Sequence, residues 1–290
     1  MAQILTLVAD RAATSLTPAI VARAREAAGG AEPVTLSPGE AVDLMLADAA
    51  DLDAVRAALG DAPIDAIATT TENRRKRLLV ADMDSTIVTG ETLDELADFA
   101  GLKQRIAAIT ARAMNGELDF KSALRERVAM LRGLSVEALE QTWQRVRLTP
   151  GAGELVATMR AHGAYAALVS GGFTFFTSRV AALVGFDMHR SNVLLDDGAT
   201  LTGRVAEPIL DRDSKLETLT RLAAERGLQM PATLAVGDGA NDLDMIRAAG
   251  LGVAFRAKPI VAAEARARVD HANLRALLFA QGYRREEIIG

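Results

Sequence analysis

The chain contains no cysteine, so disulfide bonds, thiolate nucleophiles and cysteine-ligated zinc are excluded, and a reducing compartment is permitted. It also lacks an apolar run approaching the roughly 20 residues that a membrane-spanning helix needs. Residues 1–10 have neither the basic segment nor the long apolar stretch and small-residue cleavage site of a signal peptide. From these absences we expect a cytoplasmic protein with no membrane partner.

An excess of positive charge is missing as well. Lysine and arginine number 33 against 38 aspartate and glutamate residues, which gives a formal net charge of −5. This balance disfavours general nucleic-acid binding, and a small anionic substrate would need local basic residues. Half of the 290 residues are apolar, so the chain can bury a substantial core in one large domain or in two.

The first part of the chain predicts the order strand, helix, strand, strand, helix, strand, which is the split βαβ arrangement. Polar residues 69–77 follow as the best boundary, and we place this α+β, ferredoxin-like domain at residues 1–72. The predicted elements are residues 4–8, 18–28, 33–36, 41–46, 52–59 and 64–68.

That order resembles the amino-acid-binding ACT domain, although Ser15, Leu16 and Thr17 stand where a glycine usually opens the first helix. Two roles stay open for this domain: a site that senses an amino acid, and a purely structural or dimerising role. Relatives often associate through such a domain, so a homodimer is one expectation.

The chain is organised around a short apolar run, residues 78–81, that ends in two carboxylates. The run is too short for a helix and predicts a buried strand of a parallel sheet, whose C-terminal end is where such sheets build their sites. In an extended chain Asp82 and Asp84 can face one pocket. This pair suits phosphoryl transfer, with Asp82 attacking phosphorus, Asp84 exchanging protons and Mg²⁺ offsetting negative charge. When this motif is considered alone, an ordinary turn is an alternative interpretation.

Helical patterns without an intervening strand follow this motif. They cover residues 91–99, 103–114, 120–131 and 136–146. We interpret them as a small helical insertion, at about residues 89–148, that returns to the sheet near Pro150.

A second strand, residues 164–169, is predicted to end in Ser170-Gly171-Gly172 before a helix at residues 173–183. The glycines let backbone N–H groups approach an anion at the start of that helix, although a plain turn fits equally. Residues 192–205 alternate and predict a hairpin that leaves the sheet and could cover the site. Lys215 then lies at the start of a helix that Asp213 and Ser214 are expected to cap. Its sequence context alone predicts a solvated side chain.

A third strand, residues 233–236, is closed by a turn that carries Asp238, Asn241 and Asp242. Oxygen ligands in a tight turn suit Mg²⁺, and a capped helix start is the alternative. Strands ending in Asp82, Ser170 and Asp238, with Lys215 between the last two, together resemble the motifs of the haloacid dehalogenase phosphatases from Asp82 to the end of the chain. We therefore expect residues 73–290 to form an α/β fold with a Rossmann-like parallel sheet and a helical cap.

The motifs look most like those of the phosphoserine phosphatases. The resemblance implies that Asp82 is the nucleophile and Asp84 the general acid and then base, with Asp242 orienting the groups around the metal. The residues implied to hold the phosphoryl oxygens are Ser170, Gly171, Lys215 and Asn241. Magnesium would be bound by Asp82, the backbone carbonyl of Asp84, and Asp238.

The cap carries Phe120, Leu124 and Arg127 at the spacing seen in phosphoserine phosphatases. The resemblance implies that Glu91 binds the ammonium group of the substrate and that Arg127 binds the carboxylate group of the substrate. Both pairings join groups of opposite charge. Met114 and Phe120 would line the cap. The implied activity is hydrolysis of O-phospho-L-serine to L-serine and phosphate through an aspartyl phosphate, in L-serine biosynthesis.

Alternatives to these assignments stay open. Arg127 could be a surface helix residue beside Glu126. The enzyme could act on another small phosphoester, or transfer the phosphoryl group to another alcohol such as homoserine. The N-terminal domain could be an amino-acid-sensing module to which the phosphatase is secondary.

Overall fold

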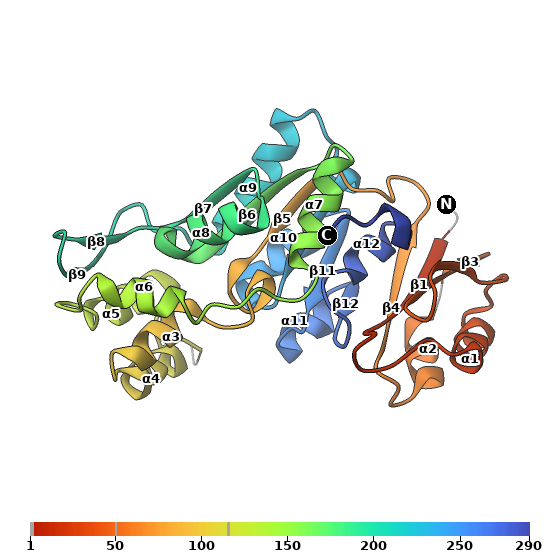
Figure 1. The fold of residues 1–290 in the computed structure, drawn as a ribbon, viewed down its shortest axis with the longest axis horizontal. Helices are drawn as coiled ribbons and strands as arrows, with labels where there is room; N and C mark the ends of the chain where they lie inside the picture. Colours follow the sequence, from red (N-terminus) through yellow and green to blue (C-terminus); the bar gives the residue numbers. More distant parts are fainter. Residues whose placement is uncertain (1–2, 50, 115–116) are drawn as a thin grey trace.

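The computed structural model describes residues 3–49, 51–114 and 117–290 (Figure 1). Its N-terminal part is an antiparallel sheet with strand order β2-β3-β1-β4, and two helices cover one face. The element order agrees with the predicted one. The elements are β1 (Gln3–Ala9), α1 (Pro18–Ala28), β2 (Val34–Ser37), β3 (Ala41–Leu46), α2 (Leu52–Leu59) and β4 (Ile64–Thr70).

Helix α1 begins where the sequence signals it. The hydroxyl of Thr17 accepts the N–H of Ile20 at 3.3 Å, Pro18 occupies the first turn, and Gly29 ends the helix with a left-handed φ of 61°. The hydroxyl of Ser15 donates to the carbonyl of Gly39 at 3.2 Å. Thr17 and Ser15, which stand near the usual glycine position, thus make local structural bonds.

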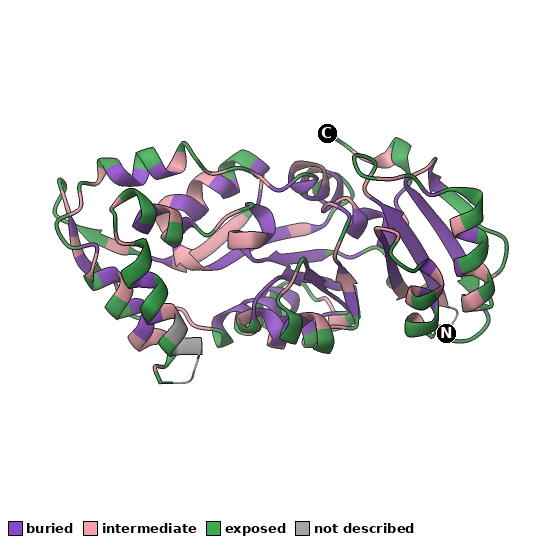
Figure 2. Cartoon of the chain, turned by 90° about the horizontal axis from the view of Figure 1, so that it is seen from below, coloured by how far each residue is buried: buried purple, intermediate pink, exposed green. Residues whose placement is uncertain are grey.

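The other face of this sheet packs on the larger part of the chain. Val8 and Ile67 belong to the large core, whereas Leu5 and Leu44 belong to the core under α1 and α2. Figure 2 shows the strands of this sheet buried and its two helices exposed on their outer side. Because alternate strand residues point to opposite faces, one sheet serves two cores.

Polar groups on the docked face have specific partners. Asp43 receives two hydrogen bonds of 2.7 Å from Arg74, which also donates to the carbonyl of Ala280. Asp65 accepts the backbone N–H of Asp270 at 2.8 Å and of Ala272 at 2.7 Å. Buried charges require such pairing, so these contacts fix the N-terminal sheet against the rest of the chain.

The larger part contains a six-stranded parallel sheet in the order β12-β11-β10-β5-β6-β7. The strand before Asp82 is central, and the chain moves first to one side of it and then to the other, which creates a topological switch point at its C-terminal end. The predicted parallel α/β core is confirmed. Its strands are β5 (Leu78–Ala81), β6 (Tyr165–Phe173), β7 (Met188–Asn192), β10 (Thr233–Gly237), β11 (Leu251–Phe255) and β12 (Ala267–Val269).

Helices cover both faces of this sheet (Figure 1). One face packs against α7 (Ala152–Ala161), α8 (Thr174–Val184) and α12 (Ala276–Ala280). The opposite face packs against α9 (Asp213–Glu225) and α10 (Leu243–Ala248), and α11 (Pro259–Glu264) follows β11. Strands buried on both faces read as continuous apolar runs, as residues 78–81 do.

The predicted helical insertion is a group of helices at one end of the molecule (Figure 1). Its two connections to the core lie side by side, because Val88 and Leu148 form a β-bridge and the N–H of Thr89 donates to the carbonyl of Arg147 at 2.9 Å. The helices are α3 (Thr92–Phe99), α4 (Lys103–Met114), α5 (Phe120–Ala129) and α6 (Glu137–Trp143).

The predicted hairpin is present as β8 (Leu194–Asp196) and β9 (Leu201–Val205), but its position differs from the expected cover over the site. It packs against the cap helix α5, and its residue Leu201 exchanges backbone hydrogen bonds of 2.8 Å with Gly133 and Leu134. The hairpin therefore extends the cap. None of the described helices is long and apolar enough to cross a membrane.

Candidate active site

The carboxyl ends of β5, β6 and β10 bring the motif residues to one edge of the sheet. Asp82 follows β5 in an extended conformation (φ −71°, ψ 159°), and Asp84 is extended as well (φ −67°, ψ 138°). Both side chains consequently line one cavity of about 320 Å³. Ser85 then takes a left-handed φ of 54° and turns the chain toward the cap.

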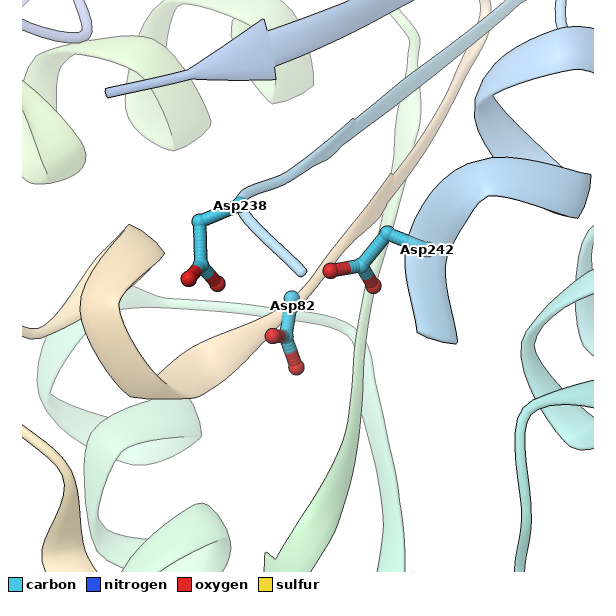
Figure 3. Close-up of side chains that lie close together, drawn as sticks. All are labelled: Asp82, Asp238 and Asp242. Carbon is cyan, nitrogen blue, oxygen red and sulfur yellow. The ribbon is translucent and has the colours of Figure 1, made fainter. Parts of the chain in front are cut away.

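The aspartates that follow β5 and β10 lie close together at this edge of the sheet (Figure 3). Asp82, Asp238 and Asp242 each offer an oxygen atom, and these atoms lie within 4.8 Å of one another. Nζ of Lys215 lies 2.7 Å from Oδ1 of Asp82 and 2.5 Å from Oδ1 of Asp242. Lys215 is only 2% exposed, which excludes the solvated position that its sequence context alone allowed.

The helix that carries Lys215 differs from the expected one at its start. Helix α9 begins at Asp213, and no side chain in the described part of the chain caps it. The Ser214 hydroxyl instead accepts the N–H of Asp211 at 3.2 Å. Lys215 therefore lies within the first turn, where the helix dipole disfavours a cation. The two carboxylates outweigh this effect because they contact the ammonium directly.

Crowding of carboxylates changes the proton affinity of the site. Burial and the Asp242 carboxylate raise the pKa of Asp82, although Lys215 opposes them. Burial raises the pKa of Asp238 to about 6, and Asp242 acts in the same direction. Burial alone would lower the pKa of Lys215, but Asp242 and Asp82 raise it above its ordinary value. The excess negative charge and the hard oxygen donors fit a divalent cation.

Asp84 occupies a different environment, between the sheet and the cap. Its Oδ1 accepts the N–H of Thr92 at 2.9 Å, and its Oδ2 accepts the hydroxyl of Ser170 at 3.4 Å. Burial raises the pKa of Asp84 to about 7, with a further contribution from Glu91. A carboxyl group with this pKa can both donate and accept a proton near neutral pH.

The strand ending in Ser170 is longer than predicted. Strand β6 continues to Phe173, so Ser170, Gly171 and Gly172 lie inside it, and the helix starts one residue later than expected, at Thr174. A Cβ atom at position 172 would lie 2.8 Å from Oδ2 of Asp84, and one at position 171 would lie 3.2 Å from Cζ of Phe120. Glycine is therefore what allows this backbone to approach the site.

The cap contributes Glu91, Phe120 and Arg127 to the same cavity. Glu91 is exposed, and its Oε1 accepts the hydroxyl of Ser85 at 2.7 Å. The half-buried guanidinium of Arg127 donates through Nε to the carbonyl of Ala123 at 3.4 Å. Within the described part of the chain, no carboxylate oxygen lies within 4.0 Å of this guanidinium.

The remaining predicted residues fall in three classes. Asn241 lines the cavity, whereas Asp242 is fully buried and its Oδ2 accepts the N–H of Gly239 at 3.0 Å. The side chain of Met114, at the end of α4, lies outside the described residues. No roles follow from these positions alone.

Lys258 lines the cavity but was missed by the sequence analysis. It follows β11, its N–H donates to the carbonyl of Asp238 at 3.1 Å, and its Nζ lies 3.8 Å from Oδ2 of Asp238. The apolar run at residues 251–255 was the available signal, because a strand beside β10 must end at the same edge of the sheet.

Comparisons with known proteins agree with this architecture. Residues 79–247, more than half of the chain, match the haloacid dehalogenase-like hydrolase family. The phosphoserine phosphatase of Streptomyces coelicolor is 44% identical over 232 residues, which cover 80% of this chain and 56% of that protein. The phosphoserine phosphatase of Archaeoglobus fulgidus is 45% identical over 205 residues, covering 71% of this chain and 60% of that protein.

The chain thus spans less than two thirds of the length of each of these two relatives. A crystal structure of a probable phosphoserine phosphatase from Vibrio cholerae, in unliganded form, superposes with a TM-score of 0.81 at 32% identity. The match covers 98% of this chain and 88% of that one, so it includes the N-terminal sheet as well as the parallel core. With a family match over more than half its length, the chain belongs to the haloacid dehalogenase-like hydrolases.

Proposed function

We propose that this chain is a Mg²⁺-dependent phosphoserine phosphatase, a phosphoric monoester hydrolase that converts O-phospho-L-serine to L-serine and phosphate. The observation that carries the proposal is that one cavity brings together charged groups of both signs. Glu91 and Arg127 line it from the cap, Asp82 and Asp84 line it at the sheet edge, and Lys215 contacts Asp82 at 2.7 Å. A phosphorylated amino acid carries an ammonium, a carboxylate and a phosphate, and the cavity offers a complement to each.

The first chemical step is assigned to the two aspartates. Oδ2 of Asp82 attacks phosphorus while Lys215 holds Oδ1 at 2.7 Å. The bond between phosphorus and the serine oxygen breaks, and protonated Asp84 gives its proton to that oxygen. This step leaves the phosphoryl group on Asp82 and a negative charge on Asp84.

The second step regenerates the enzyme. Asp84 takes a proton from a water molecule whose oxygen attacks phosphorus, and the bond from phosphorus to Asp82 breaks. Phosphate leaves and both side chains return to their starting protonation. The pKa of Asp84, raised to about 7 by burial, matches a group that must act in both directions.

The phosphoryl oxygens are assigned to the hydroxyl of Ser170, the N–H of Gly171, the ammonium of Lys215 and the amide of Asn241. Lys215 is buried and held between two carboxylates, so its charge is already in place before substrate binds. A preorganised cation of this kind stabilises charge that develops on the transferring group.

The metal is assigned to Asp82, Asp238 and the backbone carbonyl of Asp84, with Asp242 orienting the surrounding groups. When bound, Mg²⁺ supplies positive charge to the phosphoryl oxygens. Support comes from the convergence of carboxylate oxygens within 4.8 Å and from the raised pKa of Asp238, which burial and Asp242 cause. Asp242 binds Lys215 and the N–H of Gly239, so both of its oxygens already have partners.

Specificity is assigned to the cap, at about residues 89–148. The guanidinium of Arg127 is half-buried, and among the described residues neither Nη atom donates a hydrogen bond, so both can make a bidentate contact with the substrate carboxylate. Glu91 pairs with the ammonium, and Phe120 and Met114 line the cap. Residues 73–290 then form the catalytic domain and residues 1–72 an ACT-like domain. A cytoplasmic location and a homodimer accompany this proposal.

The test is phosphate release from O-phospho-L-serine and, separately, from p-nitrophenyl phosphate, each with Mg²⁺ and with EDTA. We expect metal-dependent release with a strong preference for phosphoserine. Release without that preference would contradict the assignment of Glu91 and Arg127. The absence of release from either ester would refute the proposed reaction.

A further inference from the structure

The ladder between β6 and β7 is interrupted where β6 passes the site. Val169 pairs with Arg190, and Phe173 pairs with Asn192, so residues 170–172 of β6 oppose a single residue of β7. Extra residues of this kind leave the ladder and lose their strand partners. Because buried peptide groups need hydrogen-bond partners, other groups must hold this segment of β6.

The side chain of Asn192 supplies one of those partners. It is 2% exposed, and its Nδ2 donates to the carbonyl of Gly171 at 2.9 Å. Its Oδ1 accepts the N–H of Leu210 at 2.8 Å, and Nδ2 also reaches the carbonyl of Leu210 at 3.4 Å. One orientation of the amide satisfies all these groups, because reversing it would place two acceptors, and likewise two donors, face to face.

The hydrogen bond from Asn192 to Gly171 affects the catalytic groups because it fixes the orientation of one peptide plane. The carbonyl of Gly171 and the N–H of Gly172 belong to the same planar unit, so fixing one fixes the direction of the other. The N–H of Gly172 donates to Oγ of Ser170 at 2.9 Å. The Ser170 hydroxyl keeps its own proton for Oδ2 of Asp84, at 3.4 Å, or for a phosphoryl oxygen.

The contact with Leu210 reaches the second phosphoryl-binding segment. Leu210 lies shortly before α9, whose first turn carries Lys215. Asn192 therefore joins the peptide beside Ser170 to the segment that leads to Lys215, although these segments are far apart in sequence. No other role in the site is assigned to Asn192, which does not line the cavity.

We propose that Asn192 is a positioning residue that sets the direction of the Gly171–Gly172 peptide and of the Ser170 hydroxyl, and aligns both with Lys215. The proposal rests on the proposed function, in which Ser170, Gly171 and Lys215 bind the phosphoryl group. Asn192 itself touches no reacting atom. Its removal should therefore weaken phosphoryl binding and transfer without affecting recognition of the amino-acid part of the substrate.

The experiment uses the full-length chain and the variants Asn192→Asp and Asn192→Ser. Aspartate keeps the acceptor for Leu210 but faces the carbonyl of Gly171 with an oxygen, and serine removes the long amide while keeping a small polar group. Thr174→Val is the matched control, because Thr174 Oγ1 donates to the backbone carbonyl of Asn192 at 3.0 Å, whereas the hydrogen bonds of the Asn192 side chain within the described chain go to Gly171 and Leu210. For each protein, the measurements are kcat and KM for O-phospho-L-serine and p-nitrophenyl phosphate, inhibition by inorganic phosphate, and thermal unfolding.

We expect both Asn192 variants to lose about 10- to 100-fold in kcat for both esters, as happens when a supporting partner of a site is removed. Inhibition by inorganic phosphate should weaken, and the ratio of kcat/KM between the two esters should stay within about threefold, because the cap residues are untouched. Thr174→Val should retain its kcat.

Folded Asn192 variants with the kcat and phosphate inhibition of the wild type would overturn the inference while leaving the proposed function intact. Equal losses in Thr174→Val would also overturn it, because they would show a general effect of disturbing this junction. Wild-type protein that hydrolyses neither ester would instead refute the proposed function. Because serine is smaller than asparagine, the Asn192→Ser variant provides a test if Asn192→Asp fails to fold.

Discussion

Asp238 and Asp242 lie in one turn, and we predict that neutralising them has opposite effects on the stability of the metal-free protein. In Asp238→Asn the free energy of unfolding should increase, because this carboxylate is 9% exposed and, among the described residues, its nearest cation is Lys258 at 3.8 Å. In Asp242→Asn it should decrease, because that carboxylate contacts the buried ammonium of Lys215 and accepts the N–H of Gly239.

The magnitude for Asp238 follows from its pKa. Burial raises this pKa from 3.8 to about 6, so the folded protein binds more protons than the unfolded chain between these pH values. Stability therefore falls as the pH rises through this window, and the cost is fully present above about pH 6. The difference between the two pKa values corresponds to about 3 kcal/mol at neutral pH.

For Asp242 the expected effect is a loss of about 3 kcal/mol, typical of breaking a buried ion pair. With about 2 °C per kcal/mol for a chain of this size, the two variants should move the unfolding temperature by about 6 °C in opposite directions. Mg²⁺ should stabilise the wild type and have much less effect on Asp238→Asn, because a cation that binds the folded state raises its stability.

The assay is thermal and urea unfolding at pH 7.5 in EDTA, repeated with saturating Mg²⁺ and at pH 5. The gain in Asp238→Asn should shrink at pH 5, where the wild-type carboxyl group is partly protonated. A metal-free Asp238→Asn protein that is less stable than the wild type at pH 7.5 would refute the reasoning. Loss of phosphatase activity in this variant is expected in either case.

Three further predictions concern single cationic side chains. Arg127→Lys should raise KM for phosphoserine about tenfold or more and leave KM for p-nitrophenyl phosphate within about twofold, because it loses a bidentate contact. The control Arg125→Lys, exposed on the same helix, should change neither KM value, and equal effects of the two variants would contradict the assignment of Arg127 to the substrate carboxylate. Burial lowers the pKa of Lys76 to about 8, so above pH 8 the unfolded chain keeps the lysine proton that the folded protein loses. Urea unfolding should therefore show the wild type gaining stability relative to Lys76→Met between pH 8 and 10, and a pH-independent difference would contradict this prediction. Arg74→Met should cost about 3–5 kcal/mol because it removes the cationic partner of the buried Asp43 carboxylate, whereas the exposed Arg75→Met should cost at most about 1 kcal/mol in the same denaturation experiment. Similar losses in the two variants would argue against tight docking of the N-terminal sheet.

Local sequence patterns predicted much of this fold. The run at residues 78–81 is apolar at every position, as a strand buried on both faces must be, and Asp82 marks its end. Thr17, Pro18 and Gly29 define both ends of α1 through contacts within a few residues. These features depend on neighbours in sequence, so a single sequence contains the information.

Features that depend on distant partners could not be predicted in the same way. The burial of Lys215 follows from Asp82 and Asp242, which lie on other elements. Strand β7 was missed because Met188, His189 and Arg190 have no alternating apolar pattern, and it forms at the edge of the sheet by pairing with β6. The hairpin was predicted, but its packing against the cap could not be predicted from the residues of the hairpin alone.

The central claim is that Asp82 carries the phosphoryl group, and trapping the intermediate tests it most directly. Protein mixed with O-phospho-L-serine labelled with ³²P in the phosphoryl group is quenched in acid within milliseconds and digested with pepsin at low pH. We predict label on the peptide that contains Asp82, stable in acid and lost in base, and none in Asp82→Asn. Label on another peptide, or label retained in Asp82→Asn, would contradict the claim.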